Sequence, residues 1–317
     1  MTINAIDQKV KIHFTYCREL LDWYFENHIM VSATVKTQNV MRGTVKRLKF
    51  HFGDIPVEDL DQIHVEDYKQ IRAAGGIGMK PSKGTSTSYE IRMLMAAIRR
   101  GIAKRKLPMS CHPVIEAGDG PAARERFLSR KEAAQVLKAA KRHRVKRDGQ
   151  RPRMTQTEMF AWLALYSGQR RDAIKNLHWV LQVDFARQEI QFQPRDAAIT
   201  KKRNAKQYIH PALYRAMRRF YHDRLDKGPT VFTKWFNPNE ACQKLANLSG
   251  VKGVTPHVFR HTFISWRLAA GCDVFYVASA VGSTPSTIWK SYAHIMPATN
   301  KRVMMQAKEQ RISGGRI

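Results

Sequence analysis

A segment rich in proline and small residues, from Pro108 to Ala123, separates two long stretches of helical periodicity. Proline has no backbone N–H and a fixed φ, so the prolines at 108, 113 and 121 prevent a helix from running through this segment. A chain of 317 residues is long enough for two domains of ordinary size, and the break therefore predicts two separately folded parts. The expected organisation is an N-terminal segment at 1–9, a helical domain at 10–112, a linker at 113–124, a second domain at 125–295 and a tail at 296–317 that forms a helix.

The first part is predicted to consist of helices. Apolar residues recur at spacings of three and four between Phe14 and Phe25, and again from Ser88 to Lys106. Basic side chains occupy the other face of this second helix: Arg92, Arg99, Arg100 and Lys104. A face that carries one sign of charge is either a solvated surface or a surface for phosphate contact.

The chain is strongly basic, with 55 lysines and arginines against 26 aspartates and glutamates, and a net charge of +29. Such an excess repels itself unless a polyanion neutralises it, so nucleic acid is the first partner to consider. A basic surface that only keeps the protein soluble is the alternative. The cysteines at 17, 111, 242 and 272 form no CxxC pair, which favours free thiols. Neither a signal peptide nor a long apolar run is present, and we expect a soluble cytoplasmic protein without membrane attachment.

The second part combines helices with a small sheet. A helix is expected after Ser129, which has Glu132 at the capping-box spacing, and an apolar helix is expected from Met159 to Tyr166. Residues 180–210 alternate in the manner of short strands, and helical periodicity returns at Pro211. The expected fold is mainly α with a small antiparallel β-sheet in the second domain.

Two basic motifs of this second part could reach a ligand. Ser167-Gly168-Gln169-Arg170 follows the apolar helix, and a glycine turn there would direct Arg170 back across it. The hairpin between the predicted strands crowds four basic residues: Lys201, Lys202, Arg203 and Lys206. A hairpin lysine can enter a groove or give a proton to a leaving oxygen, although a solvated turn explains the same residues.

A third motif, His257-Val258-Phe259-Arg260-His261, opens a helix for which Thr255 is the predicted N-cap and Pro256 suits the first turn. His257, Arg260 and His261 then share a face. The histidines have the i, i+4 spacing of a zinc pair, but no glutamate follows the first, so a metalloprotease site is not predicted.

A short helix is expected to end at Tyr292, with Thr284 as its N-cap and Pro285 in its first turn. A tyrosine in that position is, by itself, most often part of a core or an interface. In order, however, SGQR with LHW, a hairpin lysine, HVFRHT and SYAH resemble the tyrosine recombinase (phage integrase) family. That family has TGxR and LxW, a hairpin lysine, HxLRHTxA, LGH, and a tyrosine nine residues after the last histidine. The resemblance extends upstream and covers residues 10 to 300.

The resemblance implies a role for each matching residue. Arg170 and Arg260 match the two catalytic arginines, which grip the non-bridging oxygens of the scissile phosphate, and His257 matches a histidine that serves in proton transfer near the phenol of the nucleophile. Tyr292 matches the nucleophile, which forms a 3′-phosphotyrosine and frees a 5′-hydroxyl. Lys201 matches the lysine that protonates the leaving oxygen, and the register between Lys201 and Lys202 stays open.

The family also implies the architecture and the partners. The first domain is expected to be a helical, SAM-like core-binding domain and the second an α+β catalytic domain. The implied function is site-specific recombination that integrates or excises a phage or mobile element. A homotetramer would act on paired sites in double-stranded DNA, with the tail at 296–317 contacting a neighbouring protomer and an accessory DNA-bending protein as an optional partner. The arginines do the electrostatic work of a metal, so no metal or cofactor is expected. The expected DNA contacts are Arg92, Arg99, Arg100, Lys104, Lys202, Arg203 and Lys206.

Two positions depart from the family pattern. An acidic residue is expected three positions after Arg170, where this chain has Ala173, and the neighbouring Asp172 is a candidate substitute. The LGH element reads Val281-Gly282-Ser283, nine residues before Tyr292. Ser283 either donates one hydrogen bond to a phosphate oxygen at this catalytic position or only helps to cap the next helix.

These departures keep alternative functions open. One is a DNA-binding relative with impaired cleavage that acts as an architectural or regulatory protein. Another is a topoisomerase that relaxes supercoils with the same chemistry.

Overall fold

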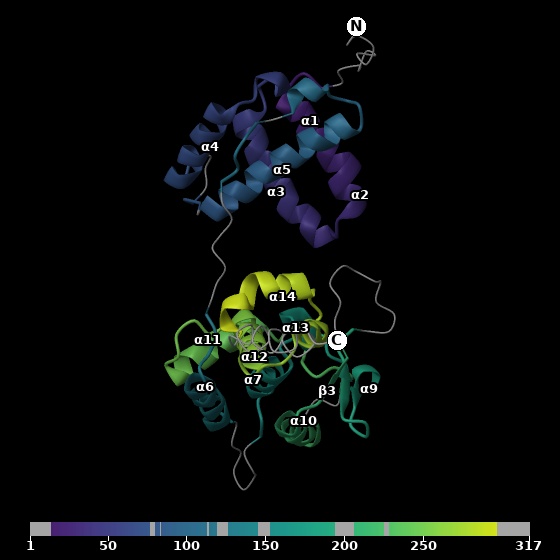
Figure 1. The fold of residues 1–317 in the computed structure, drawn as a ribbon, viewed down its shortest axis with the longest axis vertical. Helices are drawn as coiled ribbons and strands as arrows, with labels where there is room; N and C mark the ends of the chain where they lie inside the picture. Colours follow the sequence, from purple (N-terminus) through teal and green to yellow (C-terminus); the bar gives the residue numbers. More distant parts are fainter. Residues whose placement is uncertain are drawn as a thin grey trace, which may run out of the picture. The chain divides into compact units, whose positions relative to one another are not determined.

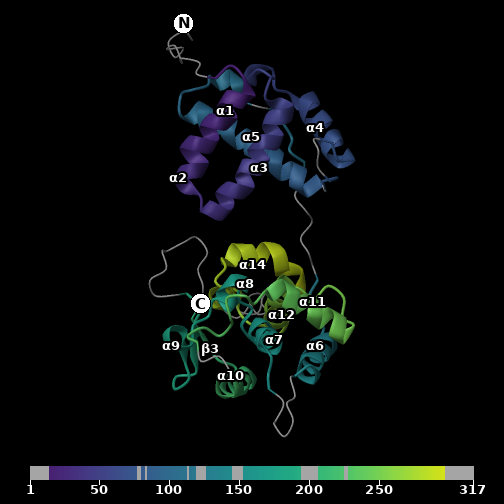
Figure 2. The same cartoon turned by 180° about the vertical axis from the view of Figure 1, so that it is seen from behind.

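Figures 1 and 2 show a computed structural model of the chain, which describes residues 14–76, 80–82, 84–112, 114–118, 126–144, 153–193, 206–224 and 228–296. The chain divides into two compact units, Met1–Ala122 and Ala123–Ile317. Each unit has a buried apolar core of its own. Within the described residues, no helix is both long and apolar enough to span a membrane.

The N-terminal unit is built from helices. They are α1 (Cys17–Tyr24), α2 (Met30–Ser32), α3 (Val35–Phe52), α4 (Gln62–Ala74) and α5 (Gly84–Ala103), with a π-helical turn at Phe25–Ile29 and 3-10 turns at Val57–Asp59 and Met109–Cys111. Helix α5 packs against α1, α3 and α4. Its predicted apolar stripe is therefore buried: Ile91, Leu94, Met95 and Ile98.

A buried charged cluster joins three of these helices. Glu90 of α5 is only 2% exposed. Its carboxylate accepts hydrogen bonds from Arg47 of α3 at 2.6 Å, from Arg72 of α4 at 3.1 Å and from the Tyr68 hydroxyl of α4 at 2.8 Å. A buried carboxylate is costly unless it is paired and hydrogen-bonded. The cluster therefore specifies how α3 and α4 pack on α5.

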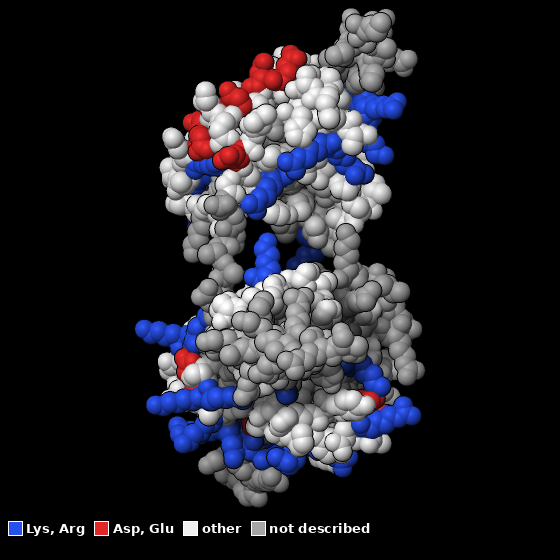
Figure 3. Space-filling model, viewed as in Figure 1, with Lys and Arg blue, Asp and Glu red and all other residues white. Residues whose placement is uncertain are grey.

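The surface of this unit is divided by charge. In Figure 3, Asp and Glu gather on the α4 side, whereas Lys and Arg follow α5. Arg92 and Arg99 are exposed on α5, Arg100 is half-buried, and Lys104 directly follows the end of the helix. This basic face is opposite the buried stripe of α5 and can approach a polyanion.

The second unit is arranged around α7. Its helices are α6 (Arg130–Arg142), α7 (Gln156–Ser167), α8 (Arg171–Lys175), α9 (Trp179–Gln182), α10 (Pro211–Asp223), α11 (Pro238–Ser249), α12 (Pro256–Ala269), α13 (Val274–Val281) and α14 (Pro285–Tyr292), followed by a 3-10 turn at Ala293–Ile295. Helix α7 packs against α6, α10, α11 and α12, with α6 and α11 on one side and α10 on the other (Figures 1 and 2). Because neighbours surround it, α7 is apolar on nearly every face.

The predicted helix starts are confirmed. Ser129 and Glu132 form the capping box of α6. The side chains of Thr255 and Thr284 cap α12 and α14, and in each helix a proline occupies the first turn. These two helices and α13 share a small core of their own, which contains Phe263, Ile264, Leu268, Val277, Val281, Ile288 and Tyr292.

A small antiparallel sheet lies beside the helices. Strands β1 (Val183–Asp184), β2 (Glu189–Gln191) and β3 (Lys206–Tyr208) pair in that order, with Val183 opposite Ile190 and Ile190 opposite Gln207. The mainly helical fold with a small antiparallel sheet, predicted from the sequence, is thus confirmed. Residues 194–205, which include Lys201, Lys202 and Arg203, lie outside the described residues, as does the predicted tail helix after Met296.

Candidate active site

Arg170 is placed by a left-handed turn at the end of α7. The C-cap residue Gly168 has a φ of 60°, and a Cβ there would lie 2.5 Å from the ring of Phe263 on α12. Only glycine combines this conformation with so close an approach. Arg170 follows as the N-cap residue of α8; it is half-buried, and burial lowers the pKa of its guanidinium.

Arg260 of α12 is held between two segments that are distant in the sequence. It is 8% exposed, and its Nη1 donates to the carbonyl oxygens of Gly168 at 3.0 Å and Val281 at 2.8 Å. Burial and then the positive charge of Arg170 lower the pKa of Arg260 to about 10, so Arg260 stays protonated at neutral pH. The two predicted arginines are therefore neighbours. Both hydrogen bonds use Nη1, which leaves Nε and Nη2 without a partner among the described residues.

Tyr292, at the end of α14, has its ring turned inward and is 6% exposed. Its hydroxyl forms a 2.5 Å hydrogen bond with Nδ1 of His261 on α12. The ring of His257 meets the ring of His261 edge-on, with centroids 4.3 Å apart, and His257 is exposed. The structure thus places His257, His261 and Tyr292 in one row beside Arg260.

The protonation states in this row follow from burial and charge. Burial raises the pKa of Tyr292 to about 12, against a smaller opposing effect of Arg260. Burial, and then the neighbouring His257 and Arg260, lower the pKa of His261 to about 4. At neutral pH the phenol is protonated and the His261 ring is neutral.

Ser283 lies directly after the left-handed turn that ends α13, and its N–H donates to the carbonyl of Ala278 at 2.9 Å. The cap of α14 is Thr284, whose hydroxyl accepts from the N–H of Thr287 at 3.2 Å. Thr284, and not Ser283, therefore caps α14. Its own hydroxyl has no hydrogen-bond partner within the described residues, and the residue two positions earlier, Val281, accepts from Arg260.

Two glutamines to which the sequence analysis assigned no role hold the site together. Gln207 of β3 donates through Nε2 to the carbonyls of Ser167 at 2.8 Å and Ala280 at 2.5 Å. Gln169 also donates to the Ala280 carbonyl, at 2.7 Å. These bonds join the strand that leads from the basic hairpin, the turn before Arg170, and the end of α13. No local pattern marks either glutamine, because the partners are set by the packing.

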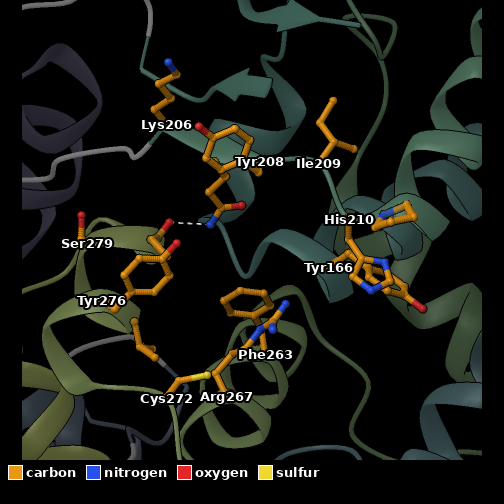
Figure 4. A pocket seen from close by; sticks show the side chains of 14 residues that line it. Tyr166, Lys206, Tyr208, Ile209, His210, Phe263, Arg267, Cys272, Tyr276 and Ser279 are labelled. Atoms are coloured by element: carbon orange, nitrogen blue, oxygen red, sulfur yellow. Dashed lines mark hydrogen bonds between the residues drawn. The ribbon is translucent and has the colours of Figure 1, made fainter. Parts of the chain in front are cut away.

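A cavity of about 430 Å³ opens beside this network. It lies between β3, the start of α10, and helices α12 and α13. Figure 4 shows Tyr208, Phe263, Arg267 and Tyr276 around it, with a dashed line for the bond between Gln207 and Ala280. Phe263 lines this cavity and also lies against Gly168, in the turn that precedes Arg170.

The remaining predicted residues have varied surroundings. Asp172 pairs with Arg171 at 2.9 Å and its side chain is 68% exposed, which does not support the interpretation that it replaces the missing acidic residue at Ala173. Lys206 pairs with Glu189 of the neighbouring strand at 2.7 Å. In the part of the chain that the structure describes, no three His, Cys, Asp or Glu side chains are grouped as metal ligands.

Comparison with known families identifies the second unit. The sequence pattern of the phage integrase family matches residues 126–298, which is more than half of the chain. The chain belongs to this family. Its members, the tyrosine recombinases, are enzymes that cleave and rejoin DNA strands. A tyrosine recombinase of Agathobacter rectalis is 33% identical over 63 residues, which are 20% of this chain and only 21% of that relative.

Solved structures share the fold over nearly the whole chain. An integrase of the Tn1549 transposon, in complex with a circular intermediate DNA, superposes with a TM-score of 0.71 at 14% identity, covering 92% of this chain and 100% of that one. A lambda integrase tetramer bound to a Holliday junction has a TM-score of 0.62 at 14% identity, covering 90% and 83% of the two chains. At such low identity the similarity shows the fold and leaves the site residues to the geometry above.

Proposed function

We propose that this protein is a site-specific DNA recombinase that cuts and rejoins strands through a 3′-phosphotyrosine, and so integrates or excises a phage or mobile element. The observation that carries the proposal is the arrangement of Arg170, Arg260, His257 and Tyr292, from three separate segments, around one point. It coincides with the order of the family motifs in the sequence.

The proposed chemistry begins with the scissile phosphate. Arg170 and Arg260 bind its non-bridging oxygens and oppose the charge that grows there during attack. Nε and Nη2 of Arg260 are the donors left for this purpose, since Nη1 is used by the Gly168 and Val281 carbonyls. Ser283, two residues after the Val281 carbonyl that Arg260 binds, adds one hydroxyl donor in place of the histidine or tryptophan of other members.

Tyr292 is the proposed nucleophile. Its oxygen attacks phosphorus, the bond to the 5′ oxygen breaks, and the energy of the phosphodiester is kept in the new link to tyrosine. The leaving 5′ oxygen receives a proton from the hairpin lysine, which we assign to Lys201 or Lys202, and His257 serves in proton transfer near the phenol of Tyr292. A 5′-hydroxyl of another strand then attacks the phosphotyrosine, so religation needs no ATP.

Double-stranded DNA is the proposed partner of both units. The net charge of +29 and the basic face of α5 (Arg92, Arg99, Arg100 and Lys104) suit the phosphate backbone, which supplies much of the affinity in such complexes. We propose a homotetramer on paired sites, with residues 296–317 contacting a neighbouring protomer. Removing residues 297–317 should then weaken assembly on DNA while a single site is still bound, and unchanged assembly would contradict this part of the proposal.

The decisive experiment traps the covalent intermediate. A site is first selected from random duplex DNA by binding and then made as a nicked suicide substrate, from which the short 3′ strand is lost after cleavage. Wild type should accumulate a protein–DNA adduct, Tyr292→Phe should form none, and the matched control Tyr276→Phe, at an exposed tyrosine, should behave as wild type. An adduct that persists in Tyr292→Phe, or that disappears only in another tyrosine variant, would refute the assignment.

A further inference from the structure

The hydroxyl of Tyr292 has a partner that the sequence motifs leave without a role. His261 is one residue beyond the second arginine, and its Nδ1 lies 2.5 Å from the Tyr292 oxygen. His257, the histidine to which the motif assigns proton transfer, contacts the ring of His261 edge-on and is itself exposed. In this structure the hydrogen-bond partner of the Tyr292 hydroxyl is therefore His261.

We propose that His261 is a catalytic residue: its Nδ1 positions the Tyr292 hydroxyl and accepts the phenolic proton as Tyr292 attacks the phosphate. This inference rests on the proposed function and adds the group that activates its nucleophile. It also divides the proton transfers between the two ends of the reaction, with His261 at the attacking oxygen and the hairpin lysine at the leaving oxygen.

The geometry suits this role. A phenol that donates to Nδ1 requires the tautomer with the proton on Nε2, and the low pKa of His261 keeps the ring neutral at neutral pH, so that Nδ1 has a lone pair to offer. A distance of 2.5 Å is well within the reach needed for direct transfer. Tyr292 needs such an acceptor, because burial raises its pKa to about 12 and very little phenolate exists at neutral pH.

Bound DNA makes His261 a stronger base. In the free protein its charged form is opposed by burial and by the neighbouring His257 and Arg260. A scissile phosphate gripped by Arg260 and Arg170 adds negative charge next to this row and favours the imidazolium. The pKa values of the phenol and the imidazole are thus drawn together only when substrate is in place.

The step balances in both directions. In cleavage, the bond from the Tyr292 oxygen to phosphorus forms, the bond from phosphorus to the 5′ oxygen breaks, the phenolic proton moves to Nδ1, and the leaving oxygen takes a proton from the lysine. In religation the incoming 5′-hydroxyl gives up its proton at the lysine end, and the imidazolium of His261 returns its proton to the leaving Tyr292 oxygen.

The test compares cleavage in single-turnover conditions on two suicide substrates, one with an ordinary 5′ oxygen and one with sulfur in that bridging position. Sulfur leaves without a proton, so it rescues defects at the leaving end and not at the nucleophile. His261→Ala should cleave both substrates about 100-fold more slowly or worse, and added imidazole should restore part of the rate. Lys201→Ala, or Lys202→Ala if that is the hairpin lysine, should be rescued by sulfur.

A second variant separates positioning from proton transfer. In His261→Asn the amide oxygen can accept the phenolic hydrogen bond near the position of Nδ1 but cannot take the proton, so the protein should bind DNA normally and still cleave slowly. His222→Asn, at an exposed histidine of α10, is the matched control and should cleave as wild type. Three results would overturn the inference: wild-type rates in His261→Ala, rescue of His261→Ala by the sulfur substrate, or faster cleavage by His261→Ala than by wild type. The last result would mean that the hydrogen bond to His261 inhibits Tyr292.

The hydrogen bond between Tyr292 and His261 can also be detected without DNA. In protein labelled with ¹⁵N-histidine, the Nδ1 resonance of His261 should report an unprotonated, hydrogen-bonded nitrogen, and Tyr292→Phe should shift it. An unshifted resonance overturns the inference whether or not DNA is cut. Failure of the proposed function has a different signature, namely a wild type that forms no adduct on any selected site.

Discussion

Replacing Gly168 by alanine tests how strongly the turn before Arg170 is constrained. The substitution introduces two separate costs. An alanine at a φ of 60° costs about 1 kcal/mol or somewhat more, and a Cβ that meets the Phe263 ring at 2.5 Å adds about 1–3 kcal/mol for displaced packing. We expect the free energy of unfolding of the second unit to fall by about 3 kcal/mol, which is roughly 6–12 °C in Tm for a unit of this size.

Gly250→Ala is the matched control for this prediction. Gly250 is also a helix C-cap, with a φ of 72°, but a Cβ there would have nothing within 4 Å. The free energy of unfolding of Gly250→Ala should therefore fall by only about 1 kcal/mol, or roughly 2–4 °C in Tm. The assay is thermal and urea unfolding of both variants, together with adduct formation on the suicide substrate.

The contact with Phe263 also predicts an effect on activity. Displacement of the turn moves the Gly168 carbonyl that accepts from Arg260, so cleavage by Gly168→Ala should drop well beyond the loss of stability. Adding Phe263→Leu to Gly168→Ala should restore part of the lost stability and part of the lost cleavage activity. Equal destabilisation of Gly168→Ala and Gly250→Ala, to within about 0.5 kcal/mol, would refute the reasoning, because it would mean that the ring is displaced without cost.

Three further predictions concern other parts of the molecule. Ser283→His should change the rate of adduct formation on the suicide substrate: a large gain would show that serine limits cleavage, and a loss would show that the site is built around serine. Glu90→Gln leaves the buried guanidinium group of Arg72 and the half-buried one of Arg47 without their counter-ion, so the N-terminal unit should lose about 3–5 kcal/mol in urea unfolding, and a loss below about 1 kcal/mol would contradict the role of the cluster. The pKa of His261 is lower in the folded protein than its ordinary 6.5, so the unfolded chain binds more protons between about pH 6.5 and 4, and stability should fall as the pH is lowered through that window. His261→Asn should flatten this dependence in a series of unfolding curves, and an unchanged slope would count against the assigned protonation state.

The sequence by itself determined most of the elements and pointed to most of the candidate site residues. Helix starts could be predicted because a cap acts over three residues, as at Ser129, Thr255 and Thr284. The mainly helical fold with a small sheet follows from the spacing of apolar residues, which is also a local property. The motif residues Arg170, Arg260 and Tyr292 were visible because their spacing and order are those of a family.

Only the tertiary structure decided how these residues meet. The bond between Tyr292 and His261 joins positions 31 residues apart, and the bond from Arg260 to the Gly168 carbonyl joins positions 92 apart. Gln207 reaches Ala280 across 73 residues, without any local signal in the sequence. Such contacts depend on how α7, α12, α13 and β3 pack, and packing is a property of the whole unit. The same packing removes water from Arg260, His261 and Tyr292, and this burial sets the protonation states on which the proposed chemistry rests.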